Sequence, residues 1–328
     1  MGAWAGRRVL VTGGEGFIGS HLVERLLEEG AAVRALVHYN PRGSMGWLED
    51  LDGDVHIMPG DVRDAERVAS AVEGREVVFH LAALIGIPYS YEATDSYVQV
   101  NVTGTHHVLQ GARRAGVDRV VHTSTSEVYG TAAYVPIDEA HPLQPQSPYA
   151  ATKVGADMLA LSFHRSFELP VSVVRPFNTY GPRQSTRAVI PALLSQLYDD
   201  AISELHVGST SPTRDFTYVT DTVGGFLAVA ASDRAVGEIV NVGSGREISV
   251  ADLIELLFTI TGIRKDLITD EQRIRPKDSE VHRLLCDNTR VREWTGWSPG
   301  VPLEDGLGDT AGWVRENPGT LHTRTYHV

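Results

Sequence analysis

The sequence has very little cysteine and no excess of positive charge. Its one cysteine, Cys286, excludes a disulfide within the chain, which fits a reducing compartment. Cys286 follows two leucines, so we expect it to pack in a core rather than to act as a nucleophile. The formal net charge of −13 disfavours nucleic acid and anionic membrane surfaces as main partners.

Long apolar runs are also missing. No stretch of about 18 apolar residues occurs, and residues 1–8 lead directly into strand-like residues 9–11 rather than into a signal-peptide segment. We therefore expect a soluble, cytoplasmic protein without a membrane partner. The thirteen histidines show no metal-ligand spacing, because His106 and His107 are adjacent and would diverge on a helix. We predict no catalytic metal.

Short apolar segments alternate with helical segments through the first half of the chain. The segments are nearly continuously apolar, as in parallel strands buried on both faces. The helical pattern of residues 18–29 ends at Gly30, a suitable C-terminal cap. The sequence predicts an α/β fold with a Rossmann-type, doubly wound parallel sheet. Its expected strands are 9–12, 33–37, 55–58, 77–81, 120–123 and 171–175.

The pattern changes after about Asn178, where prolines and longer loops become common. Ser249, with Asp252 three residues later, is expected to begin an amphipathic helix there. We predict a dinucleotide-binding domain of residues 1–180 plus about 219–242. Residues 181–218 and 243–328 are predicted to form a smaller C-terminal α/β region that binds the substrate.

A glycine-rich turn joins the first predicted strand to the first helix. Glycines in this context permit a tight turn and close approach to a pyrophosphate, which the helix N-terminus attracts. The strand, turn and helix together predict a nicotinamide dinucleotide site. Its turn residues are Gly13, Gly16, Phe17, Ile18 and Gly19.

The second predicted strand ends in Val37-His38-Tyr39-Asn40, without the acidic residue that binds the ribose of NAD. Arg34, His38 and Arg42 are compatible with a 2′-phosphate, so the sequence favours NADP over NAD. Both cofactors stay open at this point. Asp61, after the third strand, is expected to accept a hydrogen bond from the adenine amino group, or else to cap a helix.

Tyr149 and Lys153 lie one turn apart on a helix that begins after Pro148. The segment Thr123 to Gly130 follows the fifth strand, where ligands bind in open α/β sheets. A phenolate near neutral pH requires about 4 kcal/mol of stabilisation, and a lysine within about 4 Å can supply that order of energy. We predict that Tyr149 is a general base supported by Lys153.

Taken together, these motifs identify the chain as resembling the extended short-chain dehydrogenase/reductases that act on nucleotide sugars. Within that family it is most similar to the NAD(P)-dependent 4,6-dehydratases of the legionaminic-acid type. The resemblance spans nearly the whole chain. It rests on the glycine turn, the Tyr149/Lys153 pair and segments 80–91, 101–105, 175–182, 188–191, 214–219, 275–276 and 279–281.

The resemblance implies a dehydration at the sugar's C4, C5 and C6. Tyr149 would accept the C4 hydroxyl proton as hydride leaves C4, Glu127 would remove the C5 proton, and water would leave before hydride returns to C6. Thr125 and Ser126 complete the expected catalytic set. Further cofactor contacts are expected from His38, Asp61, Val62, Leu81, Ala82, Ala83, Asn101 and Thr123, and substrate contacts from Ser90, Asn178, Val189, Arg214 and Arg275.

Ser126 departs from the Thr-Asp-Glu triplet of glucose-type dehydratases, because the aspartate that protonates the leaving hydroxyl is absent. UDP-glucuronate decarboxylases also carry Thr-Ser-Glu, so decarboxylation stays an alternative, as does 4-epimerisation of a hexose. A non-catalytic dinucleotide sensor is the alternative from another class. The resemblance also implies a homodimer formed through the helices near residues 96–115 and 149–167.

Overall fold

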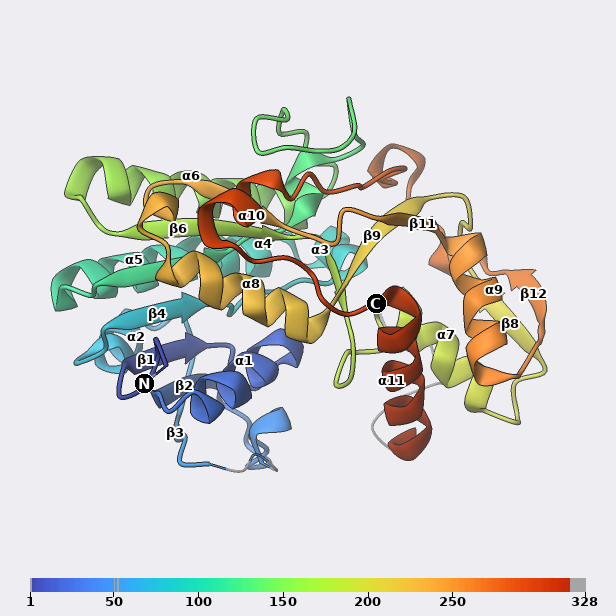
Figure 1. The fold of residues 1–328 in the computed structure, drawn as a ribbon, viewed down its shortest axis with the longest axis horizontal. Coiled ribbons are helices and arrows are strands. Elements are labelled where there is room, and N and C mark those ends of the chain that lie inside the picture. The colour runs from blue at the N-terminus through green and yellow to red at the C-terminus, as the bar shows by residue number, and fades with distance from the viewer. Residues whose placement is uncertain (1, 50, 52, 319–328) are drawn as a thin grey trace.

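A seven-stranded parallel sheet forms the centre of the protein (Figure 1). The computed structural model describes residues 2–49, 51 and 53–318. The strand order is β10-β6-β5-β4-β1-β2-β3, which confirms the predicted doubly wound Rossmann-type fold. The strands are β1 (Arg8–Thr12), β2 (Ala32–His38), β3 (His56–Gly60), β4 (Val77–His80), β5 (Arg119–Thr123), β6 (Val171–Pro176) and β10 (Ile239–Val242).

Helices cover both faces of this sheet, because its apolar side chains alternate between two cores. Val9 and Val11 of β1 join a core with α1 (Phe17–Glu28) and α8 (Val219–Ala231). Leu10 faces the opposite core. The second core is completed by α2 (Ala65–Val72), α5 (Gly104–Ala115) and α6 (Pro148–Phe167).

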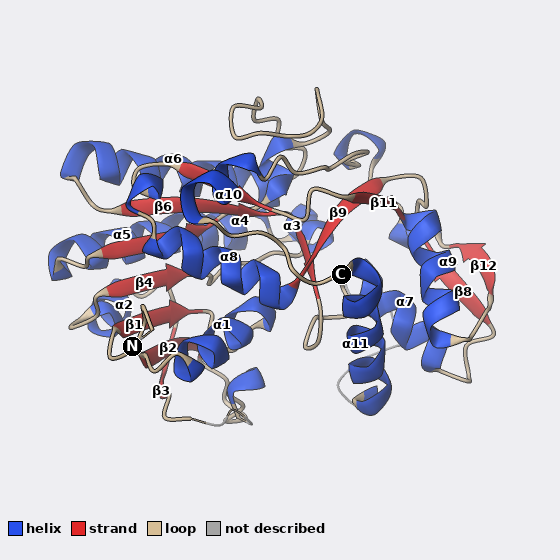
Figure 2. Ribbon diagram, in the orientation of Figure 1, coloured by secondary structure: helices blue, strands red, loops and turns tan. Residues whose placement is uncertain are grey.

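A smaller group of elements lies beyond the carboxyl ends of the main strands, beside the large sheet (Figure 2). It holds a three-stranded and a two-stranded sheet. Ser249 caps α9 by accepting a hydrogen bond from the Asp252 backbone N–H at 3.0 Å, as its spacing predicts. The elements are β7 (Asn178–Tyr180), β9 (Thr213–Tyr218), β11 (Glu247–Ser249), β8 (Glu204–Val207), β12 (Asp266–Thr269), α7 (Val189–Tyr198), α9 (Val250–Thr261) and α11 (Leu303–Glu316).

The chain returns from this smaller group to the main sheet through α8 and β10, and β10 pairs with β6. Cys286 is buried in an apolar cluster, which confirms the packing prediction. The remaining helices are short: α3 (Ile87–Glu92), α4 (Thr94–Tyr97), the π-helix η2 (Val98–Thr103), α10 (Thr289–Thr295), and the 3₁₀ helices η1 (Gly46–Leu48), η3 (Ser126–Tyr129), η4 (Asp233–Ala235), η5 (Glu271–Arg273) and η6 (Lys277–Ser279).

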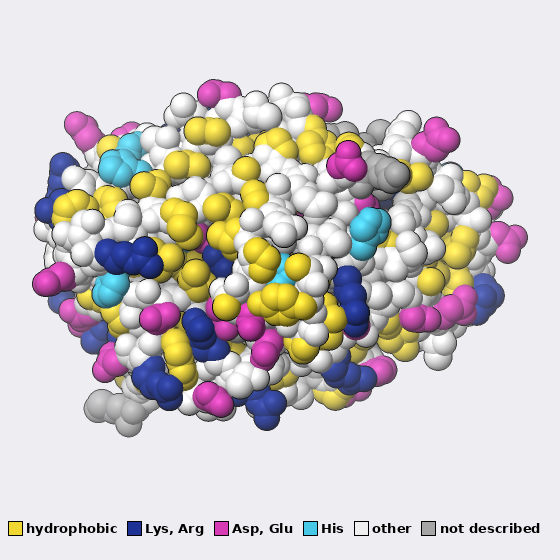
Figure 3. Space-filling model, turned by 90° about the horizontal axis from the view of Figure 1, so that it is seen from above, with side chains coloured by type: hydrophobic (Ala, Val, Ile, Leu, Met, Phe, Trp, Pro, Cys, Tyr) yellow, Lys and Arg dark blue, Asp and Glu magenta, His cyan; other side chains and the backbone are white. Residues whose placement is uncertain are grey.

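On the face seen in Figure 3, basic side chains are interspersed with acidic and apolar ones, so this face has no continuous basic surface. Within residues 2–49, 51 and 53–318, no helix has both the length and the apolar character needed to cross a membrane.

Candidate active site

The glycine turn after β1 lies against the loop that follows β4. A Cβ on Gly13 would come within 2.9 Å of the Ala82 backbone, and one on Gly19 would overlap the Gly13 carbonyl oxygen. Gly13 also has a φ of +70°, which favours glycine. Gly16 begins α1 without a side-chain cap, so the first N–H groups of α1 face the turn. This cradle fits the pyrophosphate of a dinucleotide.

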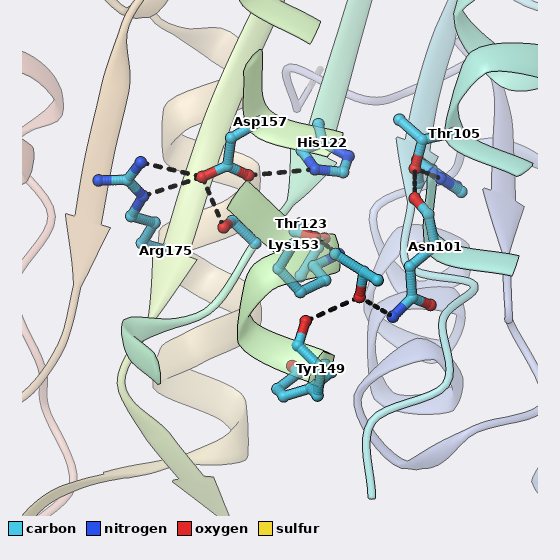
Figure 4. A network of polar contacts seen from close by, with 11 residues as sticks. Asn101, Thr105, His122, Thr123, Tyr149, Lys153, Asp157 and Arg175 are labelled. Atoms are coloured by element: carbon cyan, nitrogen blue, oxygen red, sulfur yellow. Dashed lines mark hydrogen bonds and ion pairs between the residues drawn. The ribbon is translucent and has the colours of Figure 1, made fainter. Parts of the chain in front are cut away.

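Asn101 supports the loop after β4 from within the π-helix η2. Its Oδ1 accepts a hydrogen bond from the Leu84 N–H at 2.8 Å, and its Nδ2 donates to the Leu84 carbonyl and to Thr152 Oγ1. Thr152 Oγ1 in turn donates to the Tyr149 carbonyl, so Asn101 is connected to the start of α6 (Figure 4). Asn101 is 1% exposed, which gives it a positioning role; direct contact with the cofactor stays a prediction.

The sequence suggested that Arg34 could bind a 2′-phosphate at the other end of the expected dinucleotide site. In the structure its guanidinium group binds the protein instead. Its Nη1 donates to the carbonyls of Ser70, Ala71 and Glu73 at the end of α2. Arg34 therefore satisfies α2's terminal carbonyl groups.

Asp61 forms an ion pair with Arg63, two residues later in the chain. It binds Arg63 and accepts a hydrogen bond from the Arg63 N–H, and these bonds hold the Asp61 pKa below its usual range. Asp64, not Asp61, is the N-cap of α2. The His38 side chain is 69% exposed and lies 3.9 Å from Asp61. Val62 is buried in the second core.

Tyr149 and Lys153 are buried at the start of α6, which Ser147 caps. Lys153 Nζ donates to the Thr123 carbonyl oxygen at 2.6 Å. Within the described residues no hydrogen bond joins Lys153 to Tyr149, and electrostatic support of Tyr149 by Lys153 stays a prediction. Burial lowers the Lys153 pKa to about 8. Burial raises the Tyr149 pKa, and a hydrogen bond with Thr125 opposes that rise.

A buried ionic network underlies Lys153 and was not anticipated from the sequence. Asp157, one turn after Lys153, accepts hydrogen bonds from Arg175 and Ser124. Its second oxygen lies 3.3 Å from His122 Nε2 (Figure 4). The available signal was the spacing of four residues from Lys153, which places Asp157 on the same helix face.

The charge of Glu127 acts on both the Tyr149 phenol and the Arg214 guanidinium. Glu127 belongs to η3, where Thr125 Oγ1 accepts a hydrogen bond from the Glu127 N–H. The Glu127 negative charge further raises the Tyr149 pKa. Burial lowers the Arg214 pKa, and the same Glu127 charge opposes this effect. Arg214 also pairs with Glu280 at 3.2 Å. Tyr149, Glu127 and Arg214 therefore share one electrostatic environment, in which neighbouring Ser126 is buried.

Three of the predicted ligand-binding residues have a buried polar atom that finds no hydrogen-bond partner in the part of the chain that the structure describes: Thr123 Oγ1, Asn178 Oδ1 and Arg275 Nη1. Such atoms are rare in proteins, and a bound ligand or water normally satisfies them. Ser90 differs, because its hydroxyl donates to the Ile87 carbonyl within α3. Val189 begins α7 and packs beside the core of the smaller region.

Known proteins resemble this chain over nearly its full length. A family model described as GDP-mannose 4,6 dehydratase matches residues 10–310. A dTDP-glucose 4,6-dehydratase from Actinoplanes is 33% identical, covering 94% of this chain and 98% of the relative. A UDP-glucose 4-epimerase from Mycolicibacterium smegmatis is 36% identical, again covering 94% and 98%.

A solved structure also matches this chain over nearly its full length. The dTDP-glucose 4,6-dehydratase DesIV from Streptomyces venezuelae, with NAD and TYD bound, has a TM-score of 0.86 and 33% identity, covering 96% of this chain and 98% of DesIV. Its NAD supports a nicotinamide dinucleotide as cofactor here. This chain is therefore an enzyme of the nucleotide-sugar 4,6-dehydratase family, within the extended short-chain dehydrogenase/reductases.

Proposed function

We propose that this protein is a nucleotide-sugar 4,6-dehydratase that converts an NDP-hexose, such as NDP-N-acetylglucosamine, into its 4-keto-6-deoxy form. The main support is Glu127, whose charge acts on both Tyr149 and Arg214. Glu127 would then serve as the base for the sugar's C5 proton, with Tyr149 as the base for its C4 hydroxyl and Arg214 as a cation suited to the diphosphate. A simple 4-epimerase needs no C5 base.

The cofactor would lie over the glycine turn, with Gly13, Gly16 and Gly19 against the pyrophosphate and Thr123, Tyr149 and Lys153 toward the nicotinamide. When bound, the nicotinamide supplies the acceptor and donor for hydride. Asn178, Arg214 and Arg275 would hold the substrate's diphosphate through an amide and two guanidinium groups.

Tyr149 would accept the C4 hydroxyl proton as C4 becomes a ketone. The ketone acidifies the C5 hydrogen, and Glu127 would remove that proton. The C6 hydroxyl would then leave as water, with its proton supplied by Glu127 or by a water held at Ser126. C6 would finally take back the hydride that left C4 while C5 regains a proton, which gives the 4-keto-6-deoxy sugar. Ser126 itself is a weak acid, so we assign it no direct proton transfer.

The product of the reaction tests this function. Purified protein is incubated with dTDP-glucose, UDP-glucose, UDP-N-acetylglucosamine, GDP-N-acetylglucosamine and UDP-glucuronate, and products are examined by NMR and mass spectrometry. Loss of water from one of these supports the proposal, whereas loss of carbon dioxide identifies a decarboxylase. Epimerisation is the second candidate because of the M. smegmatis relative, and unchanged mass with altered ring couplings would identify it.

We also propose a homodimer formed through η2, α5 and α6. Three large apolar side chains on or next to these helices are exposed: Val98, Met158 and Phe167. Light scattering on Met158→Glu and wild type tests this assembly, and a wild-type monomer at micromolar concentration would contradict it.

A further inference from the structure

Glu15 belongs to the glycine turn, but its carboxylate reaches the second strand. Glu15 Oε1 accepts a hydrogen bond of 2.6 Å from the backbone N–H of His38, the last residue of β2. A Cβ on Gly14 would come within 2.9 Å of Ala35 Cβ, so the turn packs directly against β2. The Glu15 carboxylate therefore lies at the carboxyl end of β2, where dinucleotide folds recognise the adenosine ribose.

The second oxygen of this carboxylate, Oε2, is buried. It accepts no hydrogen bond from any residue that the structure describes. A buried carboxylate oxygen without a donor is unfavourable, because it loses hydration that nothing replaces. A ribose hydroxyl is a donor of the required kind, and binding it would satisfy this oxygen.

Two of the positive charges near the end of β2 are engaged elsewhere, whereas the Arg42 side chain is exposed. Arg34 binds the carbonyl groups at the end of α2, and Arg63 pairs with Asp61. His38 lies 3.9 Å from Asp61. A phosphate placed at the end of β2 would meet the Glu15 carboxylate at close range, and like charges repel strongly in a partly buried site.

We infer that Glu15 makes this enzyme selective for NAD over NADP. Its carboxylate accepts a hydrogen bond from the adenosine ribose and repels a 2′-phosphate, in place of the acidic residue that β2 lacks. This inference replaces the preference for NADP drawn from the sequence. It concerns the dinucleotide alone and stands whichever sugar reaction the enzyme performs.

Binding of the two dinucleotides tests the inference without any turnover. Protein freed of retained dinucleotide is titrated calorimetrically with NAD and NADP as wild type, Glu15→Gln and Glu15→Ala. Glu28→Gln is the matched control, because it removes one exposed carboxylate from the far end of α1. We expect wild type to bind NAD at least tenfold more tightly than NADP. Both Glu15 variants should reduce this ratio tenfold or more, and Glu28→Gln should preserve it.

A second ligand separates ribose recognition from any damage to the fold. Wild type is titrated with 2′-deoxy-NAD, which lacks the hydroxyl assigned to Glu15, and circular dichroism monitors the folding of each variant. We expect the deoxy analogue to bind several-fold more weakly than NAD. Wild type binding NADP as tightly as NAD, folded Glu15 variants keeping the wild-type ratio, or the analogue binding as well as NAD would each overturn the inference.

Discussion

Arg175 donates two hydrogen bonds to one oxygen of Asp157, from Nε at 3.1 Å and from Nη2 at 2.9 Å. Both side chains are buried, and Arg175 also donates to the Tyr129 hydroxyl. The pair joins α6 to β6 one turn beyond Lys153. It therefore fixes the helix that carries Tyr149 and Lys153 against the sheet.

Asp157→Asn should destabilise the protein by about 3–5 kcal/mol, because it leaves a buried guanidinium without its counter-charge. Chemical denaturation followed by circular dichroism measures this loss. Asp233→Asn is the control, since Asp233 pairs with Arg119 but is 98% exposed, and it should lose at most about 1 kcal/mol. Similar losses in both variants would contradict a stabilising role for the buried pair.

The pH profile should reflect Lys153 and Tyr149 as a pair that shares one proton in its active form. Burial raises the Tyr149 pKa and lowers the Lys153 pKa to about 8. Below about pH 8 both groups are protonated in the free enzyme, so kcat/KM should fall about tenfold for each pH unit below that value. Above it, kcat/KM should level off.

Lys153→Met removes the ionisation near pH 8, so kcat/KM of this variant should continue to rise with pH beyond 8. Steady-state rates between pH 6 and 10, with denaturation checked at each pH, provide the measurement. A wild-type profile that is flat from pH 6 to 8 would contradict the shared proton.

Glu127→Gln should separate oxidation from dehydration. Because Tyr149 is intact, reduced nicotinamide should accumulate after substrate is added, while water loss slows by about 10²–10⁴-fold. Absorbance of the reduced cofactor and exchange of the C5 hydrogen with deuterated water measure the two steps. Tyr149→Phe provides the contrast, since it should block both. Full turnover in the glutamine variant would refute the role of Glu127.

Arg275→Ala should weaken substrate binding without destabilising the fold, because the buried Arg275 Nη1 has no hydrogen-bond partner among the described residues. We expect KM for the nucleotide sugar to rise at least tenfold, with a small change in the free energy of unfolding. Arg246→Ala, which removes an exposed arginine, is the control. A lower stability with unchanged KM would show that Arg275 is structural.

Local patterns in the sequence were enough to predict the main sheet, the glycine turn and the start of α6. These features depend on neighbours in the chain: continuous apolar segments for buried parallel strands, and Pro148 for a helix start. The sequence likewise proposes Tyr149, Lys153 and Glu127 as site residues, because they occur in short motifs, and their roles stay predictions.

The partners of several charged side chains could not be predicted from the sequence, because they depend on contacts between segments that are distant in the chain. Arg34 was expected near a phosphate, yet it closes the end of α2, and Asp157 meets Arg175 only because α6 packs on β6. The end of β2 lacks an acidic residue in the sequence, but folding of the glycine turn brings Glu15 there. Sequence order thus determined which groups the protein has and how the chain folds locally. Only the packing of turn, strand and helix determined which charges are satisfied internally and which are left for a ligand, because a charge is neutralised by its neighbours in space.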